Sequence, residues 1–126
     1  MAKWANDAVM DAALDYIADN ADLLHVCTTQ PADYSGIAAV ELASVALTAG
    51  DGNGDYTIAN GDTSGRKLTV AQQASISVTA TGTAQHIALS NGSDTLIYVT
   101  TCTGQSLTSG NTVTVPAWDI EIADPS

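Results

Sequence analysis

Apolar and polar residues recur with two different periods along the chain, which predicts one helix followed by many strands. Between residues 4 and 20 the apolar positions fall in adjacent pairs every four residues, the spacing of a single stripe along an α-helix. Asn6 suits the cap at the start of this helix, and Asn20 suits its end. A lone helix of this length is marginal in water, so we expect the stripe to pack against the remainder of the protein. The stripe consists of Trp4, Ala5, Ala8, Val9, Ala12, Ala13, Tyr16 and Ile17.

From Lys67 onward, Thr, Ser, Val and Ile alternate with the period of two that is typical of half-buried strands. Turn residues separate these segments at the spacing expected of an antiparallel sandwich or barrel. In the last segment Trp118, Ile120 and Ile122 are predicted to point one way and the acidic residues between them the other. The segments are KLTVA, ASISVTATG, AQHIALS, DTLIYVTTC, NTVTVPA and WDIEIAD.

The stretch between the helix and these strands carries mixed signals. Residues 23–28 (LLHVCT) predict a short buried strand, and the QPADYSG segment that follows predicts a loop. Residues 37–47 are ambiguous, since their Ala and Glu favour helix whereas the final SVAL favours a strand. The Gly- and Asp-rich residues 49–66 predict a long surface loop or a loop-rich hairpin.

The predicted fold is therefore mainly β, in one domain that spans residues 1–126. We expect an antiparallel β-sandwich or jelly-roll-like barrel over residues 23–123, with one N-terminal α-helix over residues 4–20 and a variable loop at about 49–66. The core lacks Phe and is built mainly from Ala, Val, Ile and Leu.

The net charge limits the classes of partner that the protein is expected to bind. Three Lys and Arg stand against 14 Asp and Glu, which gives a net charge of -11. Such a protein is poorly suited to bind nucleic-acid phosphates or an anionic membrane, so basic or neutral surfaces are the expected partners. Polar residues interrupt the N-terminal apolar stretch, which predicts synthesis in the cytoplasm without a signal peptide. Cys27 and Cys102 are predicted to be buried free thiols, with a disulfide between them left open.

Four aspartates at every fourth position of the predicted helix are the interaction candidates. Like charges at this spacing are neighbours, and each pair costs a few tenths of a kcal/mol. One explanation is that the first carboxylate is favoured by the positive end of the helix while the others are solvated. The other is that this acidic edge faces a basic neighbouring subunit. The residues are Asp7, Asp11, Asp15 and Asp19.

A weak calcium-loop candidate lies within the Gly-rich segment. Asp51, Asn53, Asp55 and Asp62 occupy positions 1, 3, 5 and 12 of such a loop. Tyr56 stands where the tight calcium turn needs Gly, and Asp and Asn are common in any tight loop. We therefore predict that calcium is not required for folding, and no other metal or cofactor is predicted.

Catalytic machinery is not evident in the sequence. His25 and His86 are the two candidates for a general base at neutral pH, and neither lies in a recognisable nucleophile motif. Both are predicted to be strand residues whose rings are satisfied by hydrogen bonds. An enzymatic function would require one of them to lie in a pocket beside Ser or Asp.

Several segments together resemble a group of small β-rich virion structural proteins of tailed phages and prophages. They are W-x-N-D-A-V-x-D-A-A-L-x-Y-I, L-x-V-C-T-x-Q-P, TSGRKLTV, VTATGTAQHIAL and the ending TSGNTVTVPAWDIEIADPS. The likeness spans most of the chain. It implies a non-enzymatic capsid decoration or cement subunit that binds and stabilises the major capsid protein lattice. The protein would be made in the host cytoplasm and located in the virion.

Other functions fit the same composition. A tail, neck or fibre-associated virion subunit would need the same rigid β core, and so would a glycan-binding or adhesion module. The expected partners are the major capsid protein or other virion proteins, with homo-oligomerisation left open. Neither nucleic acid nor a membrane is an expected partner.

Overall fold

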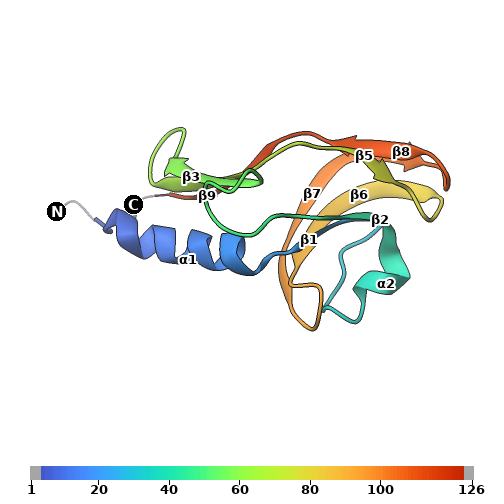
Figure 1. Cartoon of the computed structure of the whole chain (residues 1–126), viewed down its shortest axis with the longest axis horizontal. Coiled ribbons are helices and arrows are strands. Elements are labelled where there is room, and N and C mark those ends of the chain that lie inside the picture. Colours follow the sequence, from blue (N-terminus) through green and yellow to red (C-terminus); the bar gives the residue numbers. More distant parts are fainter. Residues whose placement is uncertain (1–3, 124–126) are drawn as a thin grey trace.

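The structure, a computed structural model, describes residues 4–123 and contains two helices and nine strands within them (Figure 1). Every ladder between strands is antiparallel, so the fold is mainly β with one main helix at the N-terminus, as predicted. The elements are α1 (Asp7–Asn20), β1 (Leu23–Cys27), α2 (Ile37–Val40), β2 (Glu41–Ala46), β3 (Tyr56–Asn60), β4 (Arg66–Val70), β5 (Gln73–Ser77), β6 (Gly82–Ser90), β7 (Leu96–Leu107), β8 (Thr112–Val115) and β9 (Trp118–Ile122).

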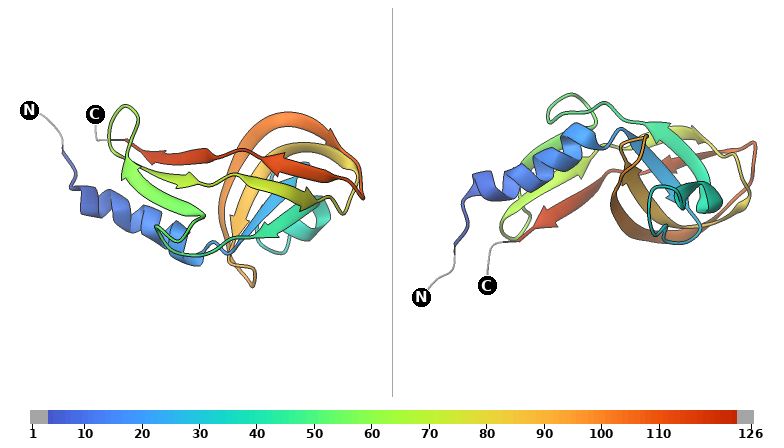
Figure 2. Two further views of the ribbon diagram at one scale, coloured as in Figure 1. Left: turned by 45° about the horizontal axis from the view of Figure 1, so that its top comes forward. Right: turned by 90° about the horizontal axis from the view of Figure 1, so that it is seen from below.

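The strands form three sheets, arranged in two halves of an elongated molecule. A four-stranded sheet of order β2-β1-β6-β7 curls opposite the pair β5-β8, and we call this the barrel half. The other half, the helix half, consists of α1 and the sheet β3-β4-β9 (Figure 1). Two residues join β4 to β5, and two join β8 to β9. The strands of the two smaller sheets therefore follow one another as a long ribbon through both halves (Figure 2).

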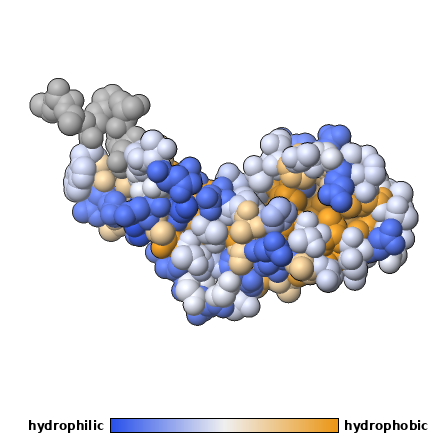
Figure 3. Space-filling model, turned by 90° about the horizontal axis from the view of Figure 1, so that it is seen from above, coloured by the Kyte–Doolittle hydropathy of each residue, from blue (hydrophilic) through white to orange (hydrophobic). Residues whose placement is uncertain are grey.

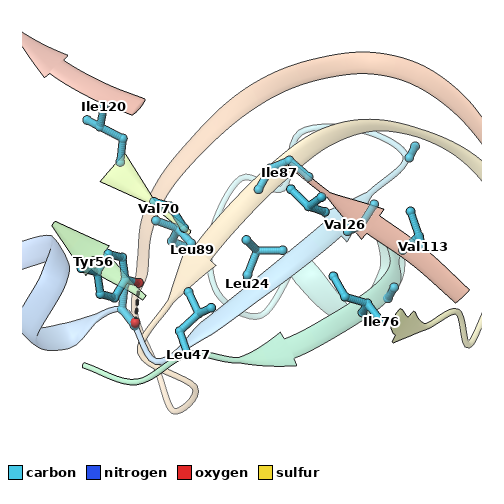
Figure 4. Packing of buried hydrophobic residues seen from close by; sticks show 14 of the residues in the cluster. Leu24, Val26, Leu47, Tyr56, Val70, Ile76, Ile87, Leu89, Val113 and Ile120 are labelled. Atoms are coloured by element: carbon cyan, nitrogen blue, oxygen red, sulfur yellow. Dashed lines mark hydrogen bonds between the residues drawn. The ribbon is translucent and has the colours of Figure 1, made fainter. Parts of the chain in front are cut away.

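One apolar core runs through both halves. Leu14 and Ala18 of α1 belong to the same buried cluster as Leu68 of β4 and as Leu24 and Leu89 of the barrel half. Figure 4 shows Tyr56 between α1 and the side chains of Val70 and Leu89, and this tyrosine is 1% exposed and is the largest fully buried side chain. Because the cluster is continuous, the two halves are parts of one domain.

Helix α1 has the predicted ends but buries a different face. The Asn6 side chain caps its start by accepting a hydrogen bond from the Ala8 N–H at 2.8 Å, and the helix ends at Asn20. Its buried residues are Met10, Leu14 and Ala18. The predicted packing of the other stripe is wrong for most of its members, although Ile17 packs against the core at the edge of the buried face. The residues wrongly predicted to pack include Trp4, Ala8, Val9, Ala12, Ala13 and Tyr16.

The ambiguous segments adopt both of the structures that their composition favours. Residues 37–47 begin as the short helix α2 and continue directly as strand β2. The segment 49–66 is a loop-rich hairpin, because β3 lies inside it and pairs with β4. The run at 23–28 forms the buried strand β1, as predicted. In β9, Ile120 is buried and Asp119 and Glu121 are exposed, which confirms the predicted alternation. Residues 1–3 and 124–126 of the predicted single domain lie outside the described residues.

The buried face of α1 gives the first prediction. Leu14 is 0% exposed, so Leu14→Asp should place an unpaired carboxylate in the core and lower the free energy of unfolding by more than about 3 kcal/mol. A typical domain has a free energy of unfolding of roughly 5–15 kcal/mol, so this loss is a large part of the total. Ala13→Asp adds the same charge on the exposed side and should cost only about 0.5–1 kcal/mol. Urea unfolding measures both; equal losses would contradict this orientation of α1.

Candidate functional site

An exposed apolar ridge lies along α1. Opposite the buried residues, Val9, Ala12, Ala13 and Tyr16 follow one another at helical spacing, and Trp4 precedes them. Trp4 is 77% exposed, Val9 67% and Tyr16 57%, and these are the exposed large hydrophobic side chains within residues 4–123. We call these five residues the apolar ridge. Large apolar side chains gathered on one face of an otherwise polar surface mark an interaction site.

The acidic residues of α1 divide into two groups. Arg66 of β4 donates to both carboxylate oxygens of Asp11, from Nε at 2.8 Å and from Nη2 at 3.3 Å. This pair ties the helix to the sheet, so Asp11 is not available to a partner. Asp7, Asp15 and Asp19 are exposed. Helical spacing places Asp15 and Asp19 along one flank of the apolar ridge.

Both cationic residues in the described part of the chain are engaged by carboxylates. Lys67 of β4 donates to Asp62 at 2.7 Å and lies 3.6 Å from Asp119. The hydrogen bond to Asp62 is the main reason why the pKa of Lys67 is raised, and the hydrogen bond to Asp11 does the same for Arg66. Within residues 4–123, Asp15 and Asp19 form no ion pair, so the flank of the apolar ridge is acidic.

A buried polar chain crosses the four-stranded sheet in the barrel half. His25 of β1 lies 3.0 Å from the Glu41 carboxylate of β2 through Nδ1, and 2.8 Å from the Ser90 hydroxyl of β6 through Nε2. The order Glu–His–Ser is that of a hydrolytic triad. His25 and Glu41 border a cavity of about 160 Å³ beneath Tyr34 and α2. The predicted satisfied ring of His25 is confirmed.

The position of Ser90 argues against nucleophilic catalysis. Ser90 is 0% exposed and does not line the cavity. Its Oγ also accepts a hydrogen bond from the Gly92 N–H at 3.2 Å. A substrate entering the cavity would meet His25 and Glu41 but not the hydroxyl. The chain instead joins three neighbouring strands through buried hydrogen bonds.

Three other residues singled out in the sequence, His86, Cys27 and Cys102, lie in surroundings that do not favour a chemical role. The buried Nδ1 of His86 has no hydrogen-bond partner, so the predicted satisfied ring is wrong at that atom. Cys27 is a buried free thiol, and Cys102 is a free, half-buried one. Burial raises the pKa of Cys27 to about 12 and also raises the pKa of Cys102. Neither sulfur is therefore an activated nucleophile at neutral pH.

The calcium-loop candidates are engaged in local hydrogen bonds. Asp51 accepts from the Ile58 N–H, and Asp55 accepts from the Thr48 N–H and the Gln73 amide. The Asn53 amide donates to the Ala49 carbonyl, and Asp62 pairs with Lys67. Within residues 4–123, no group of three or more His, Cys, Asp or Glu side chains is placed to hold a metal ion.

Comparison with family models, curated proteins and solved structures finds no match for this chain. No helix within the described range is long and apolar enough to cross a membrane. The exposed apolar side chains of the apolar ridge mark it as the candidate functional site.

The buried polar chain yields a prediction about reactivity. A fluorophosphonate probe, which labels activated serines, should not label Ser90 in the folded protein, because the hydroxyl has no exposed surface. Ser90→Ala should instead lower the free energy of unfolding by about 1–3 kcal/mol, since it leaves the buried Nε2 of His25 without a hydrogen-bond partner. Mass spectrometry of the labelled protein and urea unfolding measure the two effects. Labelling at Ser90 would revive the hydrolase hypothesis.

Calcium should not stabilise the protein, because hydrogen bonds already engage one carboxylate oxygen of Asp51 and both of Asp55. A ligand at about 100 times its Kd adds about 2.7 kcal/mol of stability, which a melting curve detects easily. We expect the same Tm in about 5 mM calcium and in EDTA. A clear rise in calcium that EDTA reverses would show that the loop rearranges to bind the ion.

Proposed function

We propose that this protein is a non-enzymatic structural subunit of a tailed-phage particle, and that it decorates the capsid by docking α1 on the major capsid protein. The resemblance of the sequence to virion structural proteins supports the location in a phage particle. The apolar ridge supports docking through α1. The ridge is the single observation that carries the proposal. The protein's own core leaves Trp4, Val9 and Tyr16 exposed, and burying these apolar side chains against a partner is favourable.

The ridge has the chemistry of a binding surface. Tyr and Trp are enriched among the residues that dominate interface energies, since each buries a large area at a small loss of conformational freedom. The small side chains of Ala12 and Ala13 between them allow a partner's backbone to approach closely. A helix that lays such a face into a groove is a recurring mode of recognition.

The acidic flank selects the class of partner. Asp15 and Asp19 are exposed and unpaired beside the ridge, and the whole chain has a net charge of -11. A second copy would bring the same negative charges to the interface, and like charges there cost several kcal/mol. A groove with apolar walls and a basic rim complements the site. The proposed partner is therefore a basic surface of the capsid lattice.

The proposal predicts how docking responds to mutation. Purified protein should co-sediment with capsids assembled without it, and Tyr16→Ser should weaken that binding about tenfold or more, the effect of losing roughly 1.4 kcal/mol. Asp15→Asn with Asp19→Asn should speed dissociation, and raising the salt should mimic this loss because exposed charges are screened within roughly 10 Å at 0.1 M.

Matched variants separate the site from the overall charge. Asp33→Asn with Asp94→Asn removes the same two charges from loops outside α1, and should leave binding within about twofold of the parent. If both double variants lose binding equally, general charge rather than the acidic flank attracts the capsid. Folded protein that fails to co-sediment at any salt concentration would move the proposal to the tail or neck. A concentration-dependent dimer that Tyr16→Ser abolishes would show that the ridge binds a second copy.

A further inference from the structure

A gap between strands β7 and β8 opens the barrel half. The two strands follow one another along the chain and are joined by a short turn, an arrangement that ordinarily produces a paired hairpin. Here β8 pairs with β5, while β7 is the outer strand of the four-stranded sheet. Their Cα atoms are almost everywhere more than 8 Å apart, against roughly 4.5–5.5 Å in paired strands. Figure 2 shows β7 arching away from β8.

The gap leads into a mainly apolar cavity of about 220 Å³, which Gln105 and Thr103 also border, and we call gap and cavity together the slot. Val26 of β1 and Ala84 of β6 line it, with Cys102 on the β7 side and Val113 and Val115 on the β8 side. Figure 3 shows apolar side chains gathered on this half of the molecule, within a more polar surround. An apolar cavity of about 150 Å³ already holds a benzene molecule, so the slot has room for one or two aliphatic side chains.

The backbone of β8 turns unpaired groups toward the slot. In its ladder with β5, Val113 stands opposite Ile76, and the Val78 N–H donates to the Asn111 carbonyl just beyond the strand. Hydrogen-bonding groups alternate between the two sides of a strand. The N–H and C=O groups of Thr112 and Thr114 therefore point away from β5, toward the slot.

The opposite wall is bent outward. Ala84 pairs with Gln105 and His86 pairs with Thr101, so three residues of β7 stand opposite one residue of β6. Such a bulge bends a strand and interrupts its ladder. The bulge lies where Cys102 and Thr103 line the slot, and it holds β7 away from β8.

We propose that the slot accepts an extended, uncharged segment of another protein, which adds as a strand to the free edge of β8 and inserts aliphatic side chains into the cavity. An extended segment fits because its own N–H and C=O groups match the spacing of those on Thr112 and Thr114. A compact small molecule could fill the cavity but would leave that edge unpaired.

The lining and the topology define the donor of the segment. No carboxylate or basic side chain lines the slot, so the segment is uncharged where it enters, in contrast to the basic partner proposed for α1. All nine strands described in this chain are already paired in sheets. A second copy could lay one of them inside the slot, between β7 and β8, only by withdrawing it from its own sheet, which favours a different protein as the donor of the segment. This inference stands independently of the apolar ridge.

The test is a selection with displayed ten-residue peptides in which every second position is randomised among uncharged residues. Selection in about 0.5 M NaCl suppresses electrostatic attraction of the peptides to the acidic helix α1. We expect the folded protein to enrich peptides with small aliphatic residues at alternate positions. Thr114→Pro removes one N–H that faces the slot and should weaken their binding about tenfold or more, whereas Thr114→Val keeps the N–H and should change it less than about threefold.

Two further measurements keep the outcome decisive. N-methylation of alternate amides in an enriched peptide removes its donors but keeps its side chains, and should abolish binding. Hydrogen exchange of the free protein should be fast at the Thr112 and Thr114 amides and slow at Val113, and the peptide should slow the former two. Enrichment of no peptide, binding that survives N-methylation in both registers, or slow exchange at Thr112 and Thr114 in the free protein would each overturn the proposal. Asp15→Asn with Asp19→Asn should leave peptide binding unchanged.

Discussion

The position of α1, and with it the face that the helix exposes, depends on the burial of Tyr56. In a chain without Phe this is the largest fully buried side chain, and its hydroxyl donates to the Ala21 carbonyl at 2.7 Å. Ala21 caps the C-terminal end of α1. Burial is the main reason why the pKa of Tyr56 is raised, so the hydroxyl keeps its proton and remains a donor at neutral pH. The neighbouring Asp55 fixes the start of β3 by binding Thr48 and Gln73.

The type and order of elements could be predicted from the sequence, but the buried face of the helix could not. Helix α1 carries two apolar stripes, one with Val9 and Tyr16 and one with Met10 and Leu14. Spacing alone favours the first stripe because it has more members. The second is buried because Met10 and Leu14 are larger than the alanines of the first stripe, and the Arg66–Asp11 pair on the same side of α1 ties the helix to β4. Tyr56 was equally hidden from local reasoning, since a tyrosine in a run of Gly and Asp resembles an exposed loop residue.

Two features could not be predicted from the sequence for the same reason. One is the buried polar chain around His25, and the other is the slot. His25 and Ser90 are 65 positions apart, and they meet because β1 lies between β2 and β6 in the sheet. The slot exists because β8 pairs with β5 and not with its neighbour in sequence. Alternation of polar and apolar residues predicts that a segment is a strand but does not say which strand it pairs with. Both features follow from strand order, which a single sequence does not encode in any local motif.

The long ribbon has a mechanical consequence. The chain crosses between the halves four times, after α1, β2, β4 and β8, and at two of these crossings β4 leads into β5 and β8 leads into β9 across only two residues. At about 3.3 Å per residue, the ribbon spans roughly 40 Å from β4 to the end of β5. A single flexible tether would let the two ends rotate independently, whereas a twisted pair of strands resists bending and torsion. The protein is thus built as a strut, and whatever binds at one end is held at a set distance and angle from whatever binds at the other.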